Sequence, residues 1–182
     1  MEDAFPENID CSQLAEKIKI YTIPFKLVPD LWSKFPIDKI NNVCNSLESI
    51  KYFITSKKGS LIRNPAITSK VPNNIGGIYF FYIRIPDFIE EYQNYLFYIG
   101  RAHHTNNENL RKRIQHYSRE KDREKITRVL KQWKDYVYLK CFPLKCKDTD
   151  IDKVENDLIN SLLPYCNNEI PNKKIRRAIN AF

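Results

Sequence analysis

The sequence predicts an α+β fold, in which a small three-stranded, mainly antiparallel sheet is flanked by helices and preceded by a helical extension. Three observations lead to this fold. Two runs, 77–84 and 95–101, are rich in β-branched and aromatic residues, and a third run, 136–142, alternates as a strand does. The segments between and after these runs have apolar residues at helical spacing. The order is therefore β-β-α-α-β-α.

The first 70 residues differ from the rest, because five prolines interrupt short helical and irregular segments. Helices are expected over 12–20 and 38–55. The polar, basic stretch 56–60 and the turn sequence Val71-Pro-Asn-Asn-Ile-Gly-Gly77 then mark a boundary. The expected organisation is an N-terminal helical extension over 1–70 and a domain over 71–182. The large apolar residues of the extension, such as Leu31, Trp32 and Phe35, are expected to serve core packing, dimerisation or target selection.

The first two strands, 77–84 and 95–101, carry apolar residues on both faces, which predicts a sheet covered by helices on both sides. Pro86 ends the first strand, and the insertion 85–94 is expected to form a long loop. Pro143 is expected to end the third strand.

Four helices are expected within the domain. Leu110, Ile114 and Tyr117 recur at helical spacing in a helix over 108–118. Thr149 is expected to cap a later helix, with Asp152 in the third position of a capping box. The helix ranges are 108–118, 122–134, 149–163 and 172–180.

The charge of +8 is unevenly distributed. Residues 101–134 carry eleven Lys and Arg against four Asp and Glu, whereas residues 1–70 carry ten against eight. This concentration favours a phosphate-bearing partner, although a solvated basic helix remains the alternative.

No run approaches the roughly 20 apolar residues of a membrane span, and the acidic start MEDAFPENID lacks a secretory layout, so a cytoplasmic protein is expected. The odd count of five cysteines favours reduced thiols. A zinc site using Cys141 and Cys146 would need four ligands to converge.

Two charged residues take inward positions on predicted helices. Glu155 lies three and four residues before Leu158 and Ile159, and Arg113 lies between Leu110 and Tyr117 at helical spacing. A buried carboxylate and a buried guanidinium must be paired, hydrogen-bonded or turned toward a cleft. They therefore either form a structural salt bridge with each other or belong to a functional site.

An ordered set of motifs resembles the GIY-YIG nuclease family. It begins with Gly77-Ile-Tyr79 and Tyr98-Ile-Gly100, each in a predicted strand, and Asn109-Leu-Arg-Lys-Arg113 resembles the family's segment that ends in a catalytic Arg. Glu155 opens a helix as the family's metal-binding Glu does, and Pro164 and Asn167 follow at similar spacing. The set covers residues 75–168. The tripeptides are farther apart than in compact members, since Tyr79 and Tyr98 are 19 positions apart.

The resemblance implies a divalent-metal-dependent endonuclease that hydrolyses phosphodiester bonds, with double-stranded DNA as the expected partner in restriction or other DNA processing. Glu155 would hold Mg²⁺ or Mn²⁺. Arg113 would brace the phosphate. Tyr79 would be the general base or water-orienting group, ionised with help from Arg101 or the metal. Tyr98 would hold the water or phosphate. The remaining expected catalytic residues are Arg101, Tyr117, which stands where the family often has His, and Asn167.

The expected contacts to nucleic acid come mostly from the basic stretch, namely Arg101, His104, Arg111, Lys112, Arg123, Arg128 and Lys131. His103-His104 is interpreted as part of a loop near the phosphate path, and Asp148, Asp150 and Asp152 as acids at a helix N-terminus. The rival function is a non-catalytic nucleic-acid-binding module on the same fold. A homodimer is also a possibility, because two sites would let a duplex cutter reach both strands.

Overall fold

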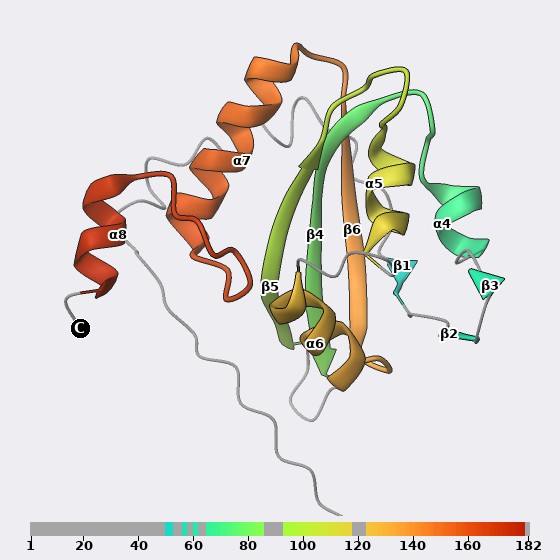
Figure 1. Cartoon of the computed structure of the whole chain (residues 1–182), viewed down its shortest axis with the longest axis horizontal. Helices are drawn as coiled ribbons and strands as arrows, with labels where there is room; N and C mark the ends of the chain where they lie inside the picture. Colours follow the sequence, from blue (N-terminus) through green and yellow to red (C-terminus); the bar gives the residue numbers. More distant parts are fainter. Residues whose placement is uncertain are drawn as a thin grey trace, which may run out of the picture.

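The computed structural model has a single main sheet with helices on both sides of it (Figure 1). It describes residues 50–52, 56–57, 60–61, 65–85, 93–117 and 123–180. The helix expected over 12–20, most of that expected over 38–55 and most of the loop expected over 85–94 lie outside these ranges. Among the described residues, no helix combines the length and the apolar character that crossing a bilayer requires.

The sheet is antiparallel and has four strands in the order β1-β6-β4-β5. The long strands β4 (Gly76–Ile85), β5 (Gln93–Ala102) and β6 (Val137–Leu144) are those expected from the sequence. The expected count of three is wrong, because β1 (Ile50–Lys51) pairs with the outer side of β6. A separate two-stranded hairpin joins β2 (Ser56–Lys57) to β3 (Ser60–Leu61).

The strand β1 also contradicts the helix expected over 38–55 at Ile50 and Lys51. Ile50 is buried in the core, and the next residue but one, Tyr52, donates its hydroxyl to the Ile114 carbonyl at 3.2 Å. The helical spacing seen in the sequence did not distinguish a helix from a short buried strand in this segment. Ile67, on α4 (Pro65–Lys70), lies in the same core. Ile50, Tyr52 and Ile67, which precede residue 71, therefore belong to the core of the domain.

The strand β6 passes through Pro143, although the sequence analysis ended it there. An added Cβ at Gly77 would lie 2.2 Å from the Phe142 carbonyl oxygen, so this carbonyl faces β4. The nitrogen of the next residue, Pro143, consequently faces the opposite side of the strand. The partner β1 reaches only Tyr138 and Leu139 of β6, so the missing N–H breaks no ladder hydrogen bond in the described sheet.

Helices cover both faces of the sheet, as the apolar strands predicted. On one face, α5 (Leu110–His116) and α6 (Glu124–Gln132) contribute Leu110, Ile114, Ile126 and Leu130 to the larger core cluster. On the other face, α7 (Asp148–Leu162) packs Ile151, Leu158 and Ile159 onto Ile78 and Ile99. The last helix, α8 (Lys173–Asn180), follows as expected, with Asn172 accepting from the Lys174 and Ile175 amides.

The start of α7 differs from the expected capping box. The N-cap residue is Lys147, which makes no side-chain cap hydrogen bond, and Asp148 and Asp150 occupy the first turn. Thr149 therefore lies inside the helix. Asp152 does not reach back to the helix start but contacts Arg101 on β5 and His103 just after that strand. Asp152 thus makes contacts with distant residues where the sequence predicted a local capping box. Asp148 and Asp150 in the first turn still complement the helix dipole.

We predict that Gly77→Ala destabilises the domain by more than about 2 kcal/mol, because Gly77 has a φ of +152° and the new Cβ would meet the Phe142 carbonyl. Urea denaturation followed by circular dichroism measures this loss. Asn73→Ala, at an exposed position in the preceding turn, is the control and should change the free energy of unfolding by less than about 0.5 kcal/mol. Equal stability of both variants would contradict the packing described for β4 and β6.

Candidate active site

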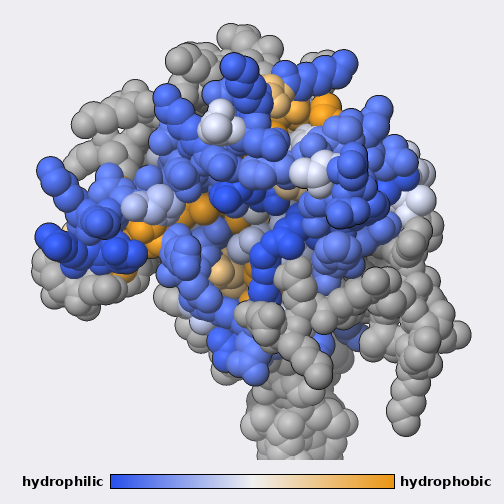
Figure 2. Space-filling view, turned by 45° about the horizontal axis from the view of Figure 1, so that its top comes forward, coloured by the Kyte–Doolittle hydropathy of each residue, from blue (hydrophilic) through white to orange (hydrophobic). Residues whose placement is uncertain are grey.

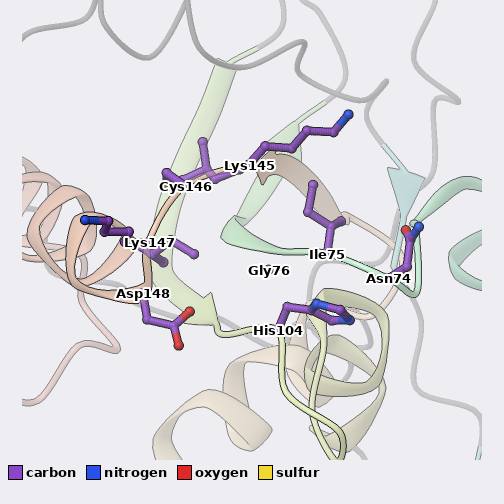
Figure 3. Close-up of a pocket in the computed structure, with 10 residues that line it drawn as sticks. Asn74, Ile75, Gly76, His104, Lys145, Cys146, Lys147 and Asp148 are labelled. Atoms are coloured by element: carbon purple, nitrogen blue, oxygen red, sulfur yellow. The ribbon is translucent and has the colours of Figure 1, made fainter.

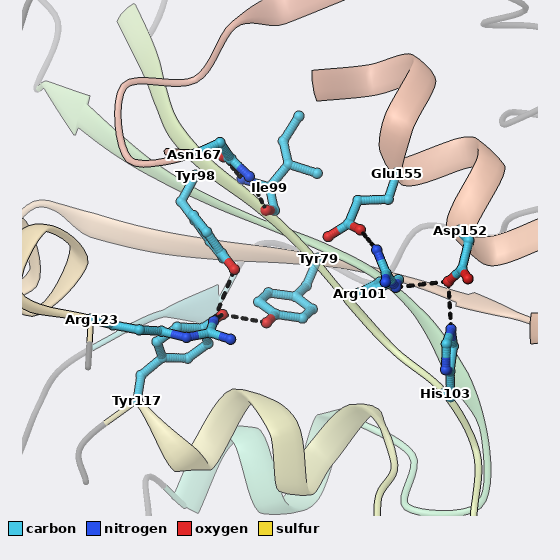
Figure 4. A network of polar contacts seen from close by, with 10 residues as sticks. All are labelled: Tyr79, Tyr98, Ile99, Arg101, His103, Tyr117, Arg123, Asp152, Glu155 and Asn167. Carbon is cyan, nitrogen blue, oxygen red and sulfur yellow. Dashed lines mark hydrogen bonds and ion pairs between the residues drawn. The ribbon is translucent and has the colours of Figure 1, made fainter. Parts of the chain in front are cut away.

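The strand β5 lies at one edge of the sheet and presents candidate residues on both of its faces. Tyr98 packs against the core cluster beneath α5 and α6. Its neighbour Ile99 packs in the cluster beneath α7, and Arg101 bonds to side chains of α7. The alternation of side chains along a strand produces this division. The predicted site residues therefore form two groups, one on each side of β5 (Figure 4).

A cleft of about 370 Å³ joins the two groups. Tyr98 and Arg101 reach it from β5, Arg123 precedes α6, Glu155 comes from α7, and Asn167 follows α7. Lys125 on α6 and Glu169 also line it. The lining is rich in polar and charged side chains. A cleft of this kind suits a charged, hydrated ligand better than an apolar one.

The group on the α7 side is a chain of ion pairs. The Arg101 guanidinium donates through Nη1 to Glu155 Oε2, and its Nε lies 2.7 Å from Asp152 Oδ1. The same Asp152 oxygen lies 2.6 Å from His103 Nε2. The structural salt bridge considered between Arg113 and Glu155 is thus replaced by an ion pair between Arg101 and Glu155. Arg113 is nonetheless close enough for its charge to favour the ionised form of Glu155.

Glu155 is buried, with a relative exposure of 8%. Burial raises the pKa of its carboxyl group, because desolvation penalises the charged form. The positive charges of Arg101 and Arg113 lower this pKa, and the negative charge of Asp152 raises it, but burial is the largest contribution. An ionised Glu155 therefore costs folding free energy, and a further cation beside it would relieve that cost.

The group on the α5 and α6 side consists of three tyrosines and one arginine. The hydroxyls of Tyr79 and Tyr117 are hydrogen-bonded to each other. Arg123 Nη1 donates to Tyr98 Oη at 3.0 Å and to Tyr117 Oη at 2.7 Å (Figure 4). Gly100 allows this packing, since an added Cβ would lie 2.5 Å from the Tyr79 ring. The packing of the Tyr79 ring therefore explains why Tyr98-Ile99-Gly100 ends in glycine.

Burial raises the pKa of Tyr79, Tyr98 and Tyr117, and it is the largest cause for each. Tyr79 is fully buried, so in this conformation it does not line the cleft. Arg101 and the metal were the alternatives expected to ionise it, but Arg101 lies on the other face of β5 and is engaged by carboxylates. Arg113 is the positive charge that lowers the Tyr79 pKa, and it does not outweigh burial. Of these three tyrosines, Tyr98 is the one that lines the cleft.

Asn167 holds the chain after α7 against the outer edge of β5. Its Oδ1 accepts from the Ile99 amide at 2.9 Å, and its Nδ2 donates to the Ile99 carbonyl at 2.8 Å. The Cys166 amide donates to the Phe97 carbonyl at 2.7 Å. These bonds satisfy edge groups that a further strand would otherwise pair. The role expected for Asn167, bracing the site, is therefore compatible with its contacts to the backbone of β5.

The basic residues expected to contact nucleic acid occupy different places. Arg101 and Arg123 line the cleft, and Arg128 and Lys131 are exposed on α6. Hydrophilic side chains cover much of the face shown in Figure 2. Arg111 donates from Nε to the Val71 carbonyl at 2.6 Å, and Lys112 donates to the Asn107 carbonyl at 3.2 Å.

His104 lies apart from the cleft. It lines a separate cavity of about 510 Å³ beside the start of α7, together with Lys145 and Lys147 (Figure 3). Cys146 is exposed at this cavity, whereas Cys141 is buried in β6. The described residues contain no group of three or more His, Cys, Asp or Glu side chains arranged to hold a metal ion. A zinc site at these cysteines has no support there.

Three residues that were not assigned to the site from the sequence lie at or beside it in the structure. The first, Asp152, contacts Arg101. The second, Lys125, lines the cleft. The third, Tyr165, has its ring centroid 4.0 Å from the ammonium of Lys125. Asp152 precedes Glu155 by three residues, which places both on one face of a helix, so this spacing was an available signal. Tyr165 had no comparable signal, because its position depends on the turn after α7.

The donor set fits a hydrated hard cation rather than a closed metal cage. Glu155 offers carboxylate oxygen at an open polar cleft, and Mg²⁺ characteristically keeps several waters when one or two carboxylates bind it. The Asn167 amide is committed to the backbone of Ile99, so it is not available as a ligand. The carboxylates at the cleft are Glu155 and Glu169, and Glu155 is the buried one that the motif resemblance assigns to the ion.

Comparison with known proteins finds no matching family model, no matching curated protein and no matching solved structure.

We predict that stability falls as the pH rises above about 10. The unfolded chain ionises its tyrosines near pH 10, while burial keeps Tyr79, Tyr98 and Tyr117 protonated in the fold. Tyr117→Phe should lose about 1–3 kcal/mol at neutral pH, because Tyr79 and Arg123 lose a partner, and should reduce the alkaline slope. Urea denaturation between pH 8 and 11 tests both effects.

The control is Tyr136→Phe, at an exposed tyrosine. It should leave the neutral stability and the alkaline slope unchanged. If both variants behave alike, the hydrogen-bonded tyrosine group does not contribute as described.

Proposed function

We propose that this chain is a divalent-metal-dependent endonuclease of the GIY-YIG kind, acting on a phosphodiester bond of nucleic acid. The observation that carries the proposal is the convergence on one cleft of Tyr98, Arg101, Arg123, Glu155 and Asn167. These residues come from separate parts of the chain. Four of them are residues that the motif resemblance implies for catalysis, and the fifth is an expected nucleic-acid contact. We further propose DNA as the substrate, in restriction or another DNA-processing role.

The cleft offers what phosphodiester hydrolysis requires. A metal ion at Glu155 would supply Lewis-acid stabilisation of the phosphate and its leaving oxygen. Arg101 and Arg123 place guanidinium groups at the cleft, where they can donate to phosphate oxygens. Tyr98 presents a hydroxyl that can orient a water molecule, and Arg123 holds this hydroxyl in place. Because burial raises the pKa of Tyr98, we infer that it orients water rather than removing a proton as phenolate.

One contact favours the rival function, a binding module without catalysis. The Arg101 guanidinium donates to Glu155, the carboxylate assigned to the metal. A guanidinium and a divalent cation compete for the same oxygen, so a permanent pair would leave a basic cleft that binds phosphate and cuts nothing. A nuclease needs Glu155 for cleavage. A binding module binds nucleic acid and cleaves none.

We predict that Glu155→Gln abolishes cleavage, lowering it by at least about 100-fold, while nucleic-acid binding survives. Its stability at pH 7 should not fall. The raised pKa of Glu155 means that its ionised form weakens the fold at pH values above that pKa, and Gln removes this cost. Supercoiled plasmid, single-stranded DNA and RNA, each with Mg²⁺ or Mn²⁺ and with or without chelator, provide the substrates.

Glu124→Gln is the matched control, since it removes one exposed carboxylate from α6 and leaves the cleft lining unchanged. The control should cut normally. If Glu155→Gln also cuts normally, Glu155 is not the metal ligand. If the unaltered protein binds but never cuts any of the substrates, the binding-module function replaces the nuclease.

We predict that exposed basic residues of α6 contribute affinity without chemistry. Reversing Arg128 and Lys131 to Glu should weaken DNA binding and lower the slope of log K against log salt by about 0.9 for each lost phosphate contact. Fluorescence anisotropy at several salt concentrations measures this slope. Reversal of Lys70 and Lys153, two exposed lysines on α4 and α7, is the charge-matched control. Equal effects of both pairs would show that only net charge matters.

A further inference from the structure

The chain of ion pairs contains an aspartate that neither the motif resemblance nor the proposed mechanism uses. Asp152 Oδ1 contacts Arg101 Nε at 2.7 Å and His103 Nε2 at 2.6 Å (Figure 4). Arg101 lies on β5, which ends at Ala102, and His103 directly follows the strand; the side chains of both residues reach Asp152 on α7. Asp152 therefore bridges Arg101 on the strand and His103 just after it, and Arg101 also holds Glu155.

These contacts divide the Arg101 guanidinium between two carboxylates with different surroundings. Its Nη1 is bound to the buried Glu155, and its Nε is bound to Asp152, whose side chain is 39% exposed. Asp152 does not line the cleft, whereas Arg101 and Glu155 do. A phosphate or a cation in the cleft can thus reach the Nη1 end of this arrangement while the Nε end stays attached to Asp152.

We propose that Asp152 is a positioning residue that retains Arg101 at the cleft when a divalent cation takes the carboxylate of Glu155. This inference rests on the proposed function. Repulsion from a cation at Glu155 would displace the guanidinium from that carboxylate. Arg101 would keep its bond to Asp152 and could offer Nη1 to a phosphate oxygen. Asp152 lowers the cost of the exchange because the displaced guanidinium keeps a negatively charged partner.

If Asp152 had a purely structural role, its loss would lower the thermal midpoint. The side chains of Arg101 and Asp152 are 38% and 39% exposed, however, so their ion pair is screened and contributes little to stability. Loss of Asp152 should accordingly leave the thermal midpoint almost unchanged. Its effect should appear in metal binding, because Arg101 would then be held by Glu155 alone and would compete more strongly with the ion.

The test is Mn²⁺ binding by isothermal titration calorimetry, without nucleic acid. Asp152→Asn should weaken binding by about 5-fold, the factor that corresponds to a coupling of about 1 kcal/mol. Asp152→Glu, which restores the carboxylate, should recover most of this loss. Asp150→Asn, in the first turn of the same helix, is the control for lost negative charge and should change binding by less than about 2-fold.

A double-mutant cycle with Arg101→Gln isolates the proposed coupling. Arg101→Gln should tighten Mn²⁺ binding by removing the competitor, and adding Asp152→Asn should then have little effect. An equal effect of Asp152→Asn with and without Arg101 would overturn the inference, since it would show only long-range electrostatics. The concentration of Mg²⁺ needed for half-maximal cleavage should shift in parallel.

Glu155→Gln separates the two possible failures. If this variant binds Mn²⁺ as the unaltered protein does, the ion is not at Glu155, and both the metal assignment and the inference fail. If Glu155→Gln loses binding but Asp152 and Arg101 show no coupling, only the inference fails.

Discussion

The position of β5 at the edge of the sheet is the constraint on which the site depends. An interior strand would have partners on both sides, and its two faces would be separated by continuous sheet. At the edge, the tyrosine face and the α7 face meet around one outer rim. Asn167 and Cys166 satisfy Ile99 and Phe97 on that rim and give the strand the protection that edge strands need. Because this covering is a short segment rather than a full strand, the cleft remains open beside it.

Burial and charge oppose each other within the site. The fold places Glu155 and three tyrosine hydroxyls where desolvation raises their pKa values, so the tyrosines favour stability as neutral hydrogen-bonding groups and Glu155 costs stability when ionised. Arg101 and Arg113 offset part of the cost of ionised Glu155, and Arg123 donates hydrogen bonds to Tyr98 and Tyr117. A group retained at such a cost is typical of functional sites, where stability is exchanged for chemistry.

Local patterns predicted the long elements well and tertiary contacts poorly. The strands β4 and β5 carry β-branched and aromatic runs, and α7 carries a clear apolar stripe, so each was predictable from its own residues. The strand β1 has two residues and exists only because β6 offers an open side, which no local window contains. Likewise the inward direction of Glu155 followed from helical spacing, but its partner Arg101 lies 54 positions away on another element. Thr149 failed as a cap because the helix begins one residue earlier, with Lys147 at the N-cap position.

The placement of Tyr98 and Arg101 on one strand has a mechanical consequence. Their backbone separation is set by a ladder of hydrogen bonds to β4, so it cannot change unless that ladder breaks. Any adjustment to a ligand must therefore come from rotation of side chains or from movement of the helices around a fixed strand. Leu163, the one described residue other than glycine with a positive φ, at 43°, stands between α7 and the segment that Asn167 anchors. The left-handed conformation of Leu163 ends α7, so the chain leaves the helix there and returns to the edge of β5, where Asn167 anchors it.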